Sequence, residues 1–374
     1  MDIVIIRPDS KMPKILFLKD SLPNGGAERQ FALLIKYLPI HWERRVWCMG
    51  RGPFEEVILA TGVQLDIKER SWRFDFTPTF NLWRLIKEWS PDLVHSWGWM
   101  STLAAAPICK YLGIPLIDSS LRGGTVRQYR KSVSKLAMQI ADRTIANSYA
   151  GMKAWGIQKV KGRVVYNGFD PERLKYCVSQ ERRDENPFTV IMTGRMILQY
   201  KDYLSFLRIA RKIILDYGLP FRFIAVGNGP DRIRIMEEAR NLVLQKSVIF
   251  PVPDVEIINL VKQADVGILL SPEGEGFSNS IMEYMMCGLP VVCNDLGGNR
   301  ELVVDGLTGF LTPTIDMQNV VDKLIYLYSH PVERIAMGCA GKNRVLKEYS
   351  LKNMISRTIK VYSELLHQTF DLNS

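Results

Sequence analysis

Short apolar runs alternate with longer amphipathic stretches along most of the chain, and this alternation constrains the fold more than any other feature. Two series of such runs occur. The first covers 14–19, 45–49, 93–95, 116–119, 144–146 and 164–166, and the second covers 189–193, 222–226, 248–250, 266–270, 291–293 and 309–311. Parallel strands that alternate with covering helices produce this pattern, so the sequence predicts an α/β protein.

A polar stretch separates the two series and ends at Pro187. The length of 374 residues fits two domains. We therefore predict a Rossmann-like domain over 1–168, a linker over 169–187, a second Rossmann-like domain over 188–349 and an amphipathic helix within 350–374. Doubly wound domains bind ligands beyond the carboxyl ends of their strands, which predicts two domains facing each other across a ligand-binding cleft.

Composition narrows the class of protein. Hydrophobic residues make up 47% and charged residues 24%, values that exclude a disordered or disulfide-scaffold chain. No apolar run reaches the roughly 18 to 20 residues of a membrane span, and the amino terminus lacks a signal-peptide core. The sequence therefore predicts a cytoplasmic protein whose six cysteines, without any Cys-x-x-Cys pair, are buried free thiols.

The positive charge is confined to the first half of the chain. Residues 1–168 carry 25 Lys and Arg against 14 Asp and Glu, whereas residues 169–374 carry 24 against 25. Five of these cations, within 122–135, occur without an acid: Arg122, Arg127, Arg130, Lys131 and Lys135. Interleaved apolar residues favour an anionic membrane surface as the partner of 122–135. A solvated helix face is the plainer alternative, and no nucleic-acid-binding motif accompanies the charge, so no nucleic-acid partner is expected.

The loop after the first strand contains Gly25 and Gly26, followed by an apolar helix. Paired glycines let backbone amides approach a ligand closely, and the start of a helix attracts phosphate. A tight turn into the helix without a ligand is the alternative.

The first strand of the second domain ends at Thr193-Gly194-Arg195, and Lys201 follows. Arg195 and Lys201 are placed to bind one diphosphate between them. The chain contains no Asp-x-Asp, so we expect these two cations, and no metal, to neutralise the diphosphate. The alternative for Lys201 is an exposed lysine in the first turn of a helix.

The most specific pattern is a strand, a glycine-rich turn and a helix that begins near Ser278. Glu275 is expected at the tip of the turn and Glu283 on the second turn of the helix. The backbone amides of Phe277, Ser278 and Asn279 would bind an anion between the two carboxylates. This arrangement fits a ligand with hydroxyls at both ends and phosphates in the middle.

The segment E-G-F-S-N-S-I-M-E, followed by 286–292, resembles the signature of the retaining glycosyltransferases of family 4, which have the GT-B fold. Several other segments agree with that family in order and spacing. They are 25–28, 92–96, 165–168, 194–201, 226–230, 297–301 and 305–310.

The resemblance implies a role for each matching residue. Glu275 would contact the donor hexose near the reacting carbon, Glu283 the ribose, and Arg195 with Lys201 the diphosphate. Gly25 and Gly26 would let the first domain, which binds the acceptor, close on the same phosphates. Family members need no metal, and their carboxy-terminal helix crosses back to the first domain.

One departure from the family is the loop after Asp118. Many members have an active-site histidine there, whereas Leu121 stands at this position here. Ser120 and Arg122 are the candidates to replace it. Arg122 and His95, at the end of a strand, are the expected acceptor-side residues, with a structural histidine as the alternative for His95. Trp97 and Trp99 could stack on a sugar or belong to the core.

Together these features predict a metal-independent retaining glycosyltransferase. Its donor would be a UDP- or GDP-linked sugar, and its acceptor a saccharide or a lipid-linked saccharide in surface polysaccharide or glycoconjugate synthesis. The alternatives are a nucleotide-sugar epimerase or hydrolase of the same fold and a non-catalytic partner subunit.

Overall fold

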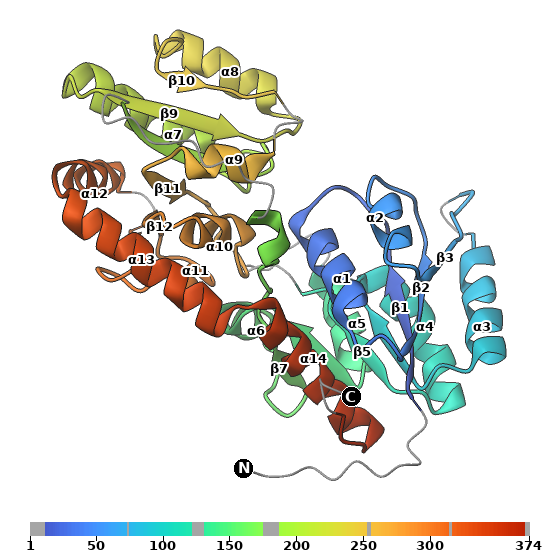
Figure 1. Ribbon diagram of the computed structural model, residues 1–374. Helices are drawn as coiled ribbons and strands as arrows, with labels where there is room; N and C mark the ends of the chain where they lie inside the picture. Colours follow the sequence, from blue (N-terminus) through green and yellow to red (C-terminus); the bar gives the residue numbers. More distant parts are fainter. Residues whose placement is uncertain are drawn as a thin grey trace, which may run out of the picture. The chain divides into compact units, whose positions relative to one another are not determined.

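The computed structural model describes residues 12–72, 75–121, 131–174, 187–252, 256–313 and 316–370. The chain divides into two compact units (Figure 1). Unit 1 comprises the described residues up to 121, those from 131 to 168, and those from 351 onward. Unit 2 comprises the described residues from 169 to 350.

Unit 1 is built on a seven-stranded parallel sheet in the order β3-β2-β1-β4-β5-β6-β7. Its strands are β1 (Lys14–Lys19), β2 (Glu43–Cys48), β3 (Gln64–Ile67), β4 (Leu93–Ser96), β5 (Leu116–Asp118), β6 (Arg143–Ala146) and β7 (Gly162–Val164). The sequence analysis missed β3, which lies at the edge of the sheet and is only half-buried. Strands on the edge carry a weaker apolar pattern because solvent covers one side of them.

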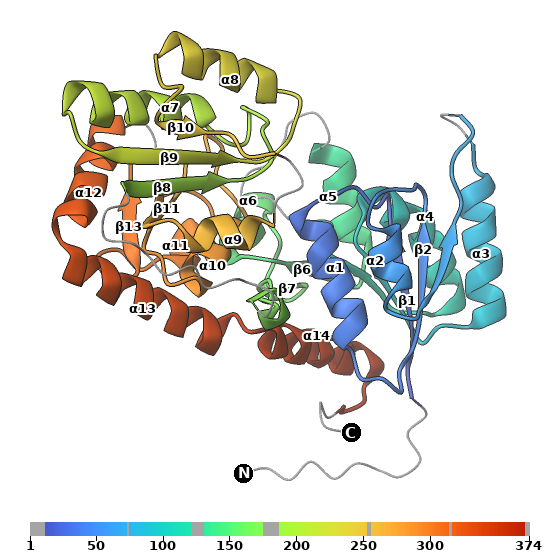
Figure 2. The same ribbon diagram turned by 45° about the horizontal axis from the view of Figure 1, so that its top comes forward.

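Helices cover both faces of this sheet (Figures 1 and 2). They are α1 (Gly26–Tyr37), α2 (Glu55–Leu59), α3 (Thr77–Trp89), α4 (Trp99–Leu112), α5 (Lys131–Ile140), α6 (Tyr149–Trp155) and α14 (Leu351–Leu366). Right-handed crossovers place α1 and α2 on one face and α3, α4 and α5 on the other. Helix α14, the last in the chain, packs against α1 and buries Tyr362 in the core of unit 1.

Unit 2 contains a six-stranded parallel sheet in the order β10-β9-β8-β11-β12-β13. Its strands are β8 (Phe188–Thr193), β9 (Phe221–Val226), β10 (Val248–Ile249), β11 (Val266–Leu269), β12 (Val291–Asn294) and β13 (Gly309–Thr312). The central strand β8 is buried along its whole length, as expected for a parallel strand covered on both faces.

The helices of unit 2 are α7 (Tyr203–Arg211), α8 (Arg232–Asn241), α9 (Ile257–Lys262), α10 (Asn279–Met286), α11 (Asn299–Leu302), α12 (Met317–Ser329) and α13 (Pro331–Glu348). A 3-10 turn, η2 (Pro171–Leu174), precedes β8. The apolar pattern predicted one helix over 202–217, but α7 ends at Arg211 and a π-helical turn, η3 (Lys212–Asp216), continues it. The prediction of an α/β fold with two doubly wound parallel sheets is thereby confirmed.

The cysteines and the helices bear on two further sequence predictions. Cys48, Cys109 and Cys293 are buried free thiols, but Cys287 is half-buried and Cys339 is exposed, so the prediction was wrong for these two. Cys177 lies outside the described residues. Among the described helices, none combines the length and apolar character that crossing a membrane requires.

Candidate functional site

The loops at the carboxyl edge of the sheet in unit 2 interlock through glycines. A Cβ atom on Gly227, which follows β9, would lie 1.9 Å from the carbonyl oxygen of Gly194, which follows β8. The φ angle of Gly227 is +149°, a value that side chains disfavour. The side chain of Tyr203 ties the same two loops together, since its hydroxyl lies 3.0 Å from the Gly194 carbonyl and 2.8 Å from that of Val226.

Glu275 and Lys201, two of the predicted site residues, are in contact. The Lys201 ammonium forms an ion pair with Glu275 Oε1, and the Ser271 hydroxyl donates to the same oxygen over 3.1 Å. Lys201 is only 8% exposed, which excludes the alternative of an exposed lysine. Because one oxygen receives two donors, the carboxylate is fixed at the tip of the turn after β11.

The backbone of Glu275 is held as well. Its carbonyl oxygen accepts a hydrogen bond of 2.8 Å from the amide of Gly298. A Cβ atom on Gly297 would approach this oxygen to 2.2 Å, and the φ angle of Gly297 is +59°. The glycine pair 297–298 therefore allows the loop after β12 to lie directly against the turn that carries Glu275.

Glu283 lies on the second turn of α10 and forms a buried ion pair with Arg173. Arg173 Nη2 also lies 3.5 Å from Glu256 Oε1. Burial disfavours the charged guanidinium of Arg173, but the two carboxylates outweigh burial, so the pKa of Arg173 lies above its ordinary value. The sequence analysis placed Arg173 in the linker and missed this contact, because no local spacing links η2 to α10.

Helix α10 is fixed to the end of β8 by side chains on one of its faces. The Thr193 amide donates to the Tyr284 hydroxyl over 2.6 Å, and the Ser280 hydroxyl donates to the Thr193 carbonyl over 3.0 Å. Ser278 caps the helix, as predicted, by accepting from the Ile281 amide over 3.4 Å. The amino terminus of α10, which includes Asn279, thus starts between the two glutamates in the chain.

The remaining predicted residues of unit 2 flank this arrangement. Phe277 is 4% exposed and packs edge-on against Tyr349, with ring centroids 4.9 Å apart. Arg195 is exposed on the loop after β8 that also carries Lys201. One cation of the predicted pair is therefore buried against a carboxylate, while the side chain of the other reaches solvent.

In unit 1, Gly25 and Gly26 lie at the start of α1, with Gly25 as the N-cap residue. A buried ion pair lies beside them: Lys19 Nζ at the end of β1 is 3.0 Å from Glu28 Oε1 in the first turn of α1. Lys19 therefore neutralises the negative charge of Glu28 at the start of α1. The sequence analysis singled out Gly25 and Gly26 but gave Glu28 and Lys19 no role.

A hydrogen-bonded network surrounds Asp118 at the carboxyl end of β5. Asp118 is fully buried and accepts from the Thr102 hydroxyl over 2.6 Å and from the Ser120 hydroxyl over 2.8 Å. Burial raises the pKa of Asp118 to about 6, against the effect of these hydrogen bonds, and nearby Asp20 adds to the rise. Asp20 in turn accepts from the Ser101 amide over 2.8 Å.

Of the two predicted acceptor-side residues, His95 lies within the described residues and Arg122 does not. His95 is 1% exposed, and its ring nitrogens lie 2.6 Å from the hydroxyls of Tyr362 and Ser119. These contacts favour the structural alternative for His95. Arg122 lies outside the described residues, so its role stays a prediction.

Other residues of this loop and strand belong to the core of unit 1. Leu121, at the position where the family often has histidine, is 1% exposed and packs among Met138, Ala146 and Met152. Trp97 is 7% exposed and contacts Phe31, which supports the core alternative for this tryptophan.

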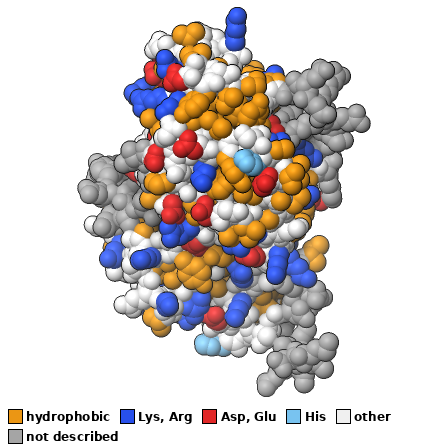
Figure 3. Space-filling view, turned by 90° about the vertical axis from the view of Figure 1, so that its left-hand side faces the viewer, with side chains coloured by type: hydrophobic (Ala, Val, Ile, Leu, Met, Phe, Trp, Pro, Cys, Tyr) orange, Lys and Arg blue, Asp and Glu red, His pale blue; other side chains and the backbone are white. Residues whose placement is uncertain are grey.

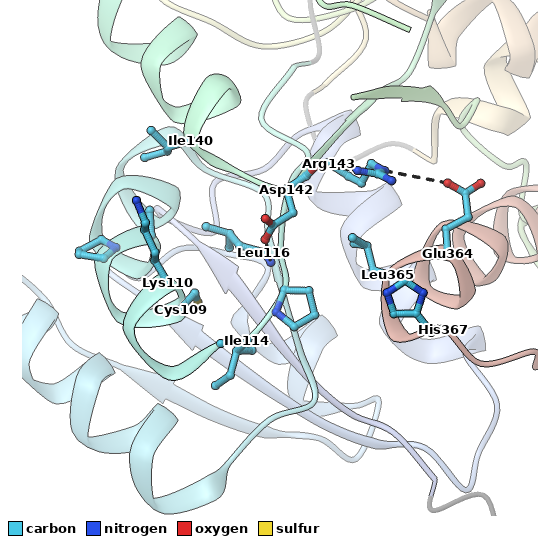
Figure 4. Close-up of a pocket in the computed structure, with 14 residues that line it drawn as sticks. Cys109, Lys110, Ile114, Leu116, Ile140, Asp142, Arg143, Glu364, Leu365 and His367 are labelled. Atoms are coloured by element: carbon cyan, nitrogen blue, oxygen red, sulfur yellow. Dashed lines mark hydrogen bonds and ion pairs between the residues drawn. The ribbon is translucent and has the colours of Figure 1, made fainter. Parts of the chain in front are cut away.

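A hollow at the opposite, amino edge of the unit 1 sheet is separate from these loops. It has a volume of about 970 Å³ and is lined by ends of α4 and α14 and the starts of β5 and β6 (Figure 4). Glu364 of α14 lies 2.7 Å from Arg163 and 4.0 Å from Arg143 at its wall. These contacts attach α14 to β6 and β7.

Two family models together match most of the chain. The family model "Glycosyltransferase Family 4" matches residues 24–173, and "Glycosyl transferases group 1" matches residues 178–344. The second match contains Arg195, Lys201, Glu275 and Glu283, and the first contains Gly25, Gly26 and Arg173.

The chain is also similar to individual proteins. The chain is 28% identical to N-acetyl-alpha-D-glucosaminyl L-malate synthase of Bacillus anthracis, over 39% of this chain and 38% of that protein. It is 22% identical to UDP-Gal:alpha-D-GlcNAc-diphosphoundecaprenol alpha-1,3-galactosyltransferase of Escherichia coli, over 78% of this chain and 80% of that protein. Anabaena HepE in complex with UDP-glucose superposes with a TM-score of 0.82 at 21% identity, covering 94% of this chain and 100% of HepE.

Proposed function

The chain belongs to the GT-B glycosyltransferases that these two family models describe, and we propose that it is a retaining enzyme that uses a UDP-linked sugar. The observation that carries the proposal is the Lys201–Glu275 ion pair at the turn before α10. The Escherichia coli relative is named for UDP-Gal and HepE forms a complex with UDP-glucose, which supports UDP over GDP as the nucleotide.

The ion pair suits donor binding because both partners have a better counterpart on a sugar diphosphate. Lys201 would turn to the diphosphate, together with Arg195 from the same loop. Glu275 would then accept hydrogen bonds from hexose hydroxyls. Lys201 thereby keeps an anionic partner, and hydroxyl donors satisfy the oxygens of Glu275.

Glu283 would accept from the ribose hydroxyls, with Arg173 holding its carboxylate ionised and oriented. The amides of Phe277, Ser278 and Asn279 at the start of α10 would bind a phosphate, since helix starts favour anions. We assign a phosphate-binding role also to the backbone of Gly25 and Gly26 at the start of α1.

The proposed reaction needs no resident metal. The acceptor hydroxyl attacks the anomeric carbon from the face that the nucleotide leaves, through an oxocarbenium-like transition state. The departing phosphate accepts the proton of that hydroxyl, while Arg195 and Lys201 stabilise its charge. Glu275, close to the reacting carbon, stabilises the positive charge that develops on the sugar.

For the acceptor we propose a lipid-linked saccharide in the synthesis of a surface polysaccharide or glycoconjugate. The diphosphoundecaprenol-linked acceptor named for the Escherichia coli relative supports this class. The net charge of +11 over residues 1–168 supports it too, because a lipid diphosphate and the membrane around it are anionic. Arg122 is the proposed acceptor-side residue, since the contacts of His95 favour a structural role for that residue.

The test is sugar transfer by Glu275→Gln, with Glu273→Gln as the matched control two residues away. Glu273 is half-buried and accepts a hydrogen bond from the Gln199 side chain over 3.4 Å. We expect Glu275→Gln to lower kcat by about 100-fold or more while UDP still binds. Full transfer by this variant would disprove the catalytic assignment.

The same assay tests two further parts of the proposal. EDTA should leave the rate of transfer unchanged, and a large loss restored by magnesium would contradict a metal-independent reaction. The product should keep the anomeric configuration of the donor, which NMR of the product establishes. Turnover of the donor without any acceptor would instead indicate an epimerase or a hydrolase.

A further inference from the structure

Exposed aromatic side chains gather at one place in unit 1. Trp72, Phe76 and Phe80 are 62%, 75% and 62% exposed. Within the described part of the chain, no other tryptophan or phenylalanine is exposed, although the protein has 8 and 15 of these residues. Together with half-buried Trp83 these three residues form what we call the α3 aromatic patch.

The fold holds the patch in this exposed position. Phe76 is the N-cap residue of α3, and Phe80 and Trp83 follow on the same helix face, with ring centroids of the latter two 5.7 Å apart. The opposite face of α3 is buried in the sheet layer through Leu82 and Ile86, so the helix cannot rotate the aromatic rings inward.

Asp75 fixes the turn that leads into the helix. Its carboxylate accepts from the amides of Ser71 and Thr77, each over 2.9 Å. A hydrogen bond with the Thr77 side chain and the two from backbone amides lower the pKa of Asp75. Trp72 and Phe76 are chain neighbours of the residues that these hydrogen bonds join.

Cations accompany the aromatic rings. Residues 68–88 contain five Lys and Arg and three Asp and Glu, and Arg84 is paired with Glu88 over 2.6 Å. The Lys87 ammonium lies 5.5 Å from the centroid of the Trp83 ring. Tryptophan and phenylalanine mixed with lysine and arginine is the composition of segments that lie in a membrane interface, where rings enter the headgroup region and cations meet anionic lipid.

The helices beside α3 also expose apolar side chains, of which Tyr111 and Ile140 lie at helix ends toward the amino edge of the sheet. Helix α4 packs against both α3 and α5, so the three form one layer on the same face of the sheet. Tyr111 of α4 is 82% exposed, and α5 exposes Val133, Leu136 and Ile140 at 41%, 49% and 43%. Neither α4 nor α5 contains an acidic residue. By contrast, acidic and basic side chains are interspersed on the face shown in Figure 3.

We propose that the α3 aromatic patch docks unit 1 on an anionic membrane surface, with Trp72, Phe76 and Phe80 entering the headgroup layer. The patch lies at the end of α3 next to the carboxyl edge of the sheet, because α3 runs antiparallel to the strands it connects. Gly25 and Asp118 lie at the same edge. Docking there would bring that edge to a lipid-linked acceptor; this last step rests on the proposed function, whereas docking itself does not.

The experiment is co-sedimentation of the full chain with vesicles of phosphatidylcholine containing about one third phosphatidylglycerol. The test variant is Trp72→Ser, Phe76→Ser, Phe80→Ser. Its matched control replaces three equally exposed apolar residues of unit 2, Ile233, Val332 and Ile335, which are 72%, 75% and 62% exposed, by serine. We expect the test variant to bind at least ten-fold more weakly and the control to bind like the wild type.

Binding of the test variant at wild-type strength would overturn the proposal, and so would absence of wild-type binding. Ultracentrifugation without lipid provides a further arm, because a dimer that the test variant loses would assign the patch to a second copy of the chain instead. Transfer to a short water-soluble acceptor should be equal in test variant and wild type. If transfer is absent from both while the wild type binds vesicles, the proposed function fails and the docking proposal stands.

Discussion

Glu275 and Glu283 in unit 2 and Asp118 in unit 1 are carboxylates held in opposite ways, whereas Glu28 in unit 1 is ion-paired with Lys19. In unit 2 the carboxylates of Glu275 and Glu283 form ion pairs with Lys201 and Arg173, which come from other segments. In unit 1 the carboxylate of Asp118 is fully buried and accepts hydrogen bonds from the Thr102 and Ser120 hydroxyls and from the Ser120 amide.

Because these carboxylates are held by different kinds of groups, the two edges are suited to different roles. The lysine of an ion pair between distant segments can exchange its carboxylate for an anionic ligand, because the ligand supplies the replacement charge. A carboxylate held by neighbouring hydroxyl and amide groups is part of the scaffold and gains nothing from a ligand. The contrast supports our proposal that unit 2 binds the donor, while the most exposed Trp and Phe side chains among the described residues belong to unit 1.

The largest expected effect comes from removing a partner of a buried carboxylate in unit 2. Arg173→Ala leaves Glu283, which is 5% exposed, without its cation. We expect a loss of about 3 kcal/mol in the free energy of unfolding, measured by urea denaturation. Arg300→Ala is the control, because the Arg300–Asp295 pair is exposed and is worth about 0 to 1 kcal/mol. Equal losses in both variants would contradict the distinction between buried and exposed pairs.

A smaller, pH-dependent effect is expected in unit 1 from Asp118→Asn. Because the folded protein raises the pKa of Asp118 to about 6, the contribution of this residue to stability is complete below its ordinary pKa of 3.8 and is lost as the pH rises through about 6. Asparagine cannot ionise and retains hydrogen-bonding atoms for Thr102 and Ser120. The free energy of unfolding of the variant, relative to that of the wild type, should therefore rise by about 2 to 3 kcal/mol as the pH increases from 4 to 7.5.

Thermal denaturation of both proteins across that pH range measures the difference. A constant offset between the two curves would show that Asp118 does not titrate as the buried network requires. It would also remove the contrast between a scaffold carboxylate in unit 1 and ion-paired carboxylates in unit 2.

The smallest expected effect comes from removing a helix cap, and one cap from each unit can be compared. Ser278 caps α10 and Ser148 caps α6, each by accepting from a backbone amide. Replacing either serine by alanine should cost about 1 kcal/mol of stability. Only Ser278→Ala should also weaken UDP binding, by about two- to ten-fold in calorimetry. Equal weakening by both would argue against a phosphate site at the start of α10.

Local patterns in the sequence were sufficient for much of the fold. The run at 14–19 is β1, and Ser278 is the cap of α10 as predicted. These features depend on neighbours in the chain, since apolar periodicity and helix capping act over a few residues. Strand β3 and the π-helical turn η3 escaped prediction, because the first depends on its edge position and the second on packing at the end of α7.

The glutamates of the candidate site were predicted from their motif, but their partners were not all found. Lys201 was identified as a phosphate-binding cation, yet its contact with Glu275 joins residues 74 apart in the chain. Arg173 was assigned to a linker, although it pairs with Glu283 across 110 residues. His95 was considered for an acceptor role, whereas α14 supplies the Tyr362 hydroxyl that contacts its ring.

By itself, the sequence determined the alternation of strands and helices, the glutamate turn with its helix start, and the positive charge of the first half. Each of these is written in residues close together in the chain. The tertiary structure decided which cation neutralises which carboxylate, which histidine is buried, and which aromatic side chains remain at the surface. Those outcomes depend on burial and on contacts between distant segments, and folding alone brings such segments together.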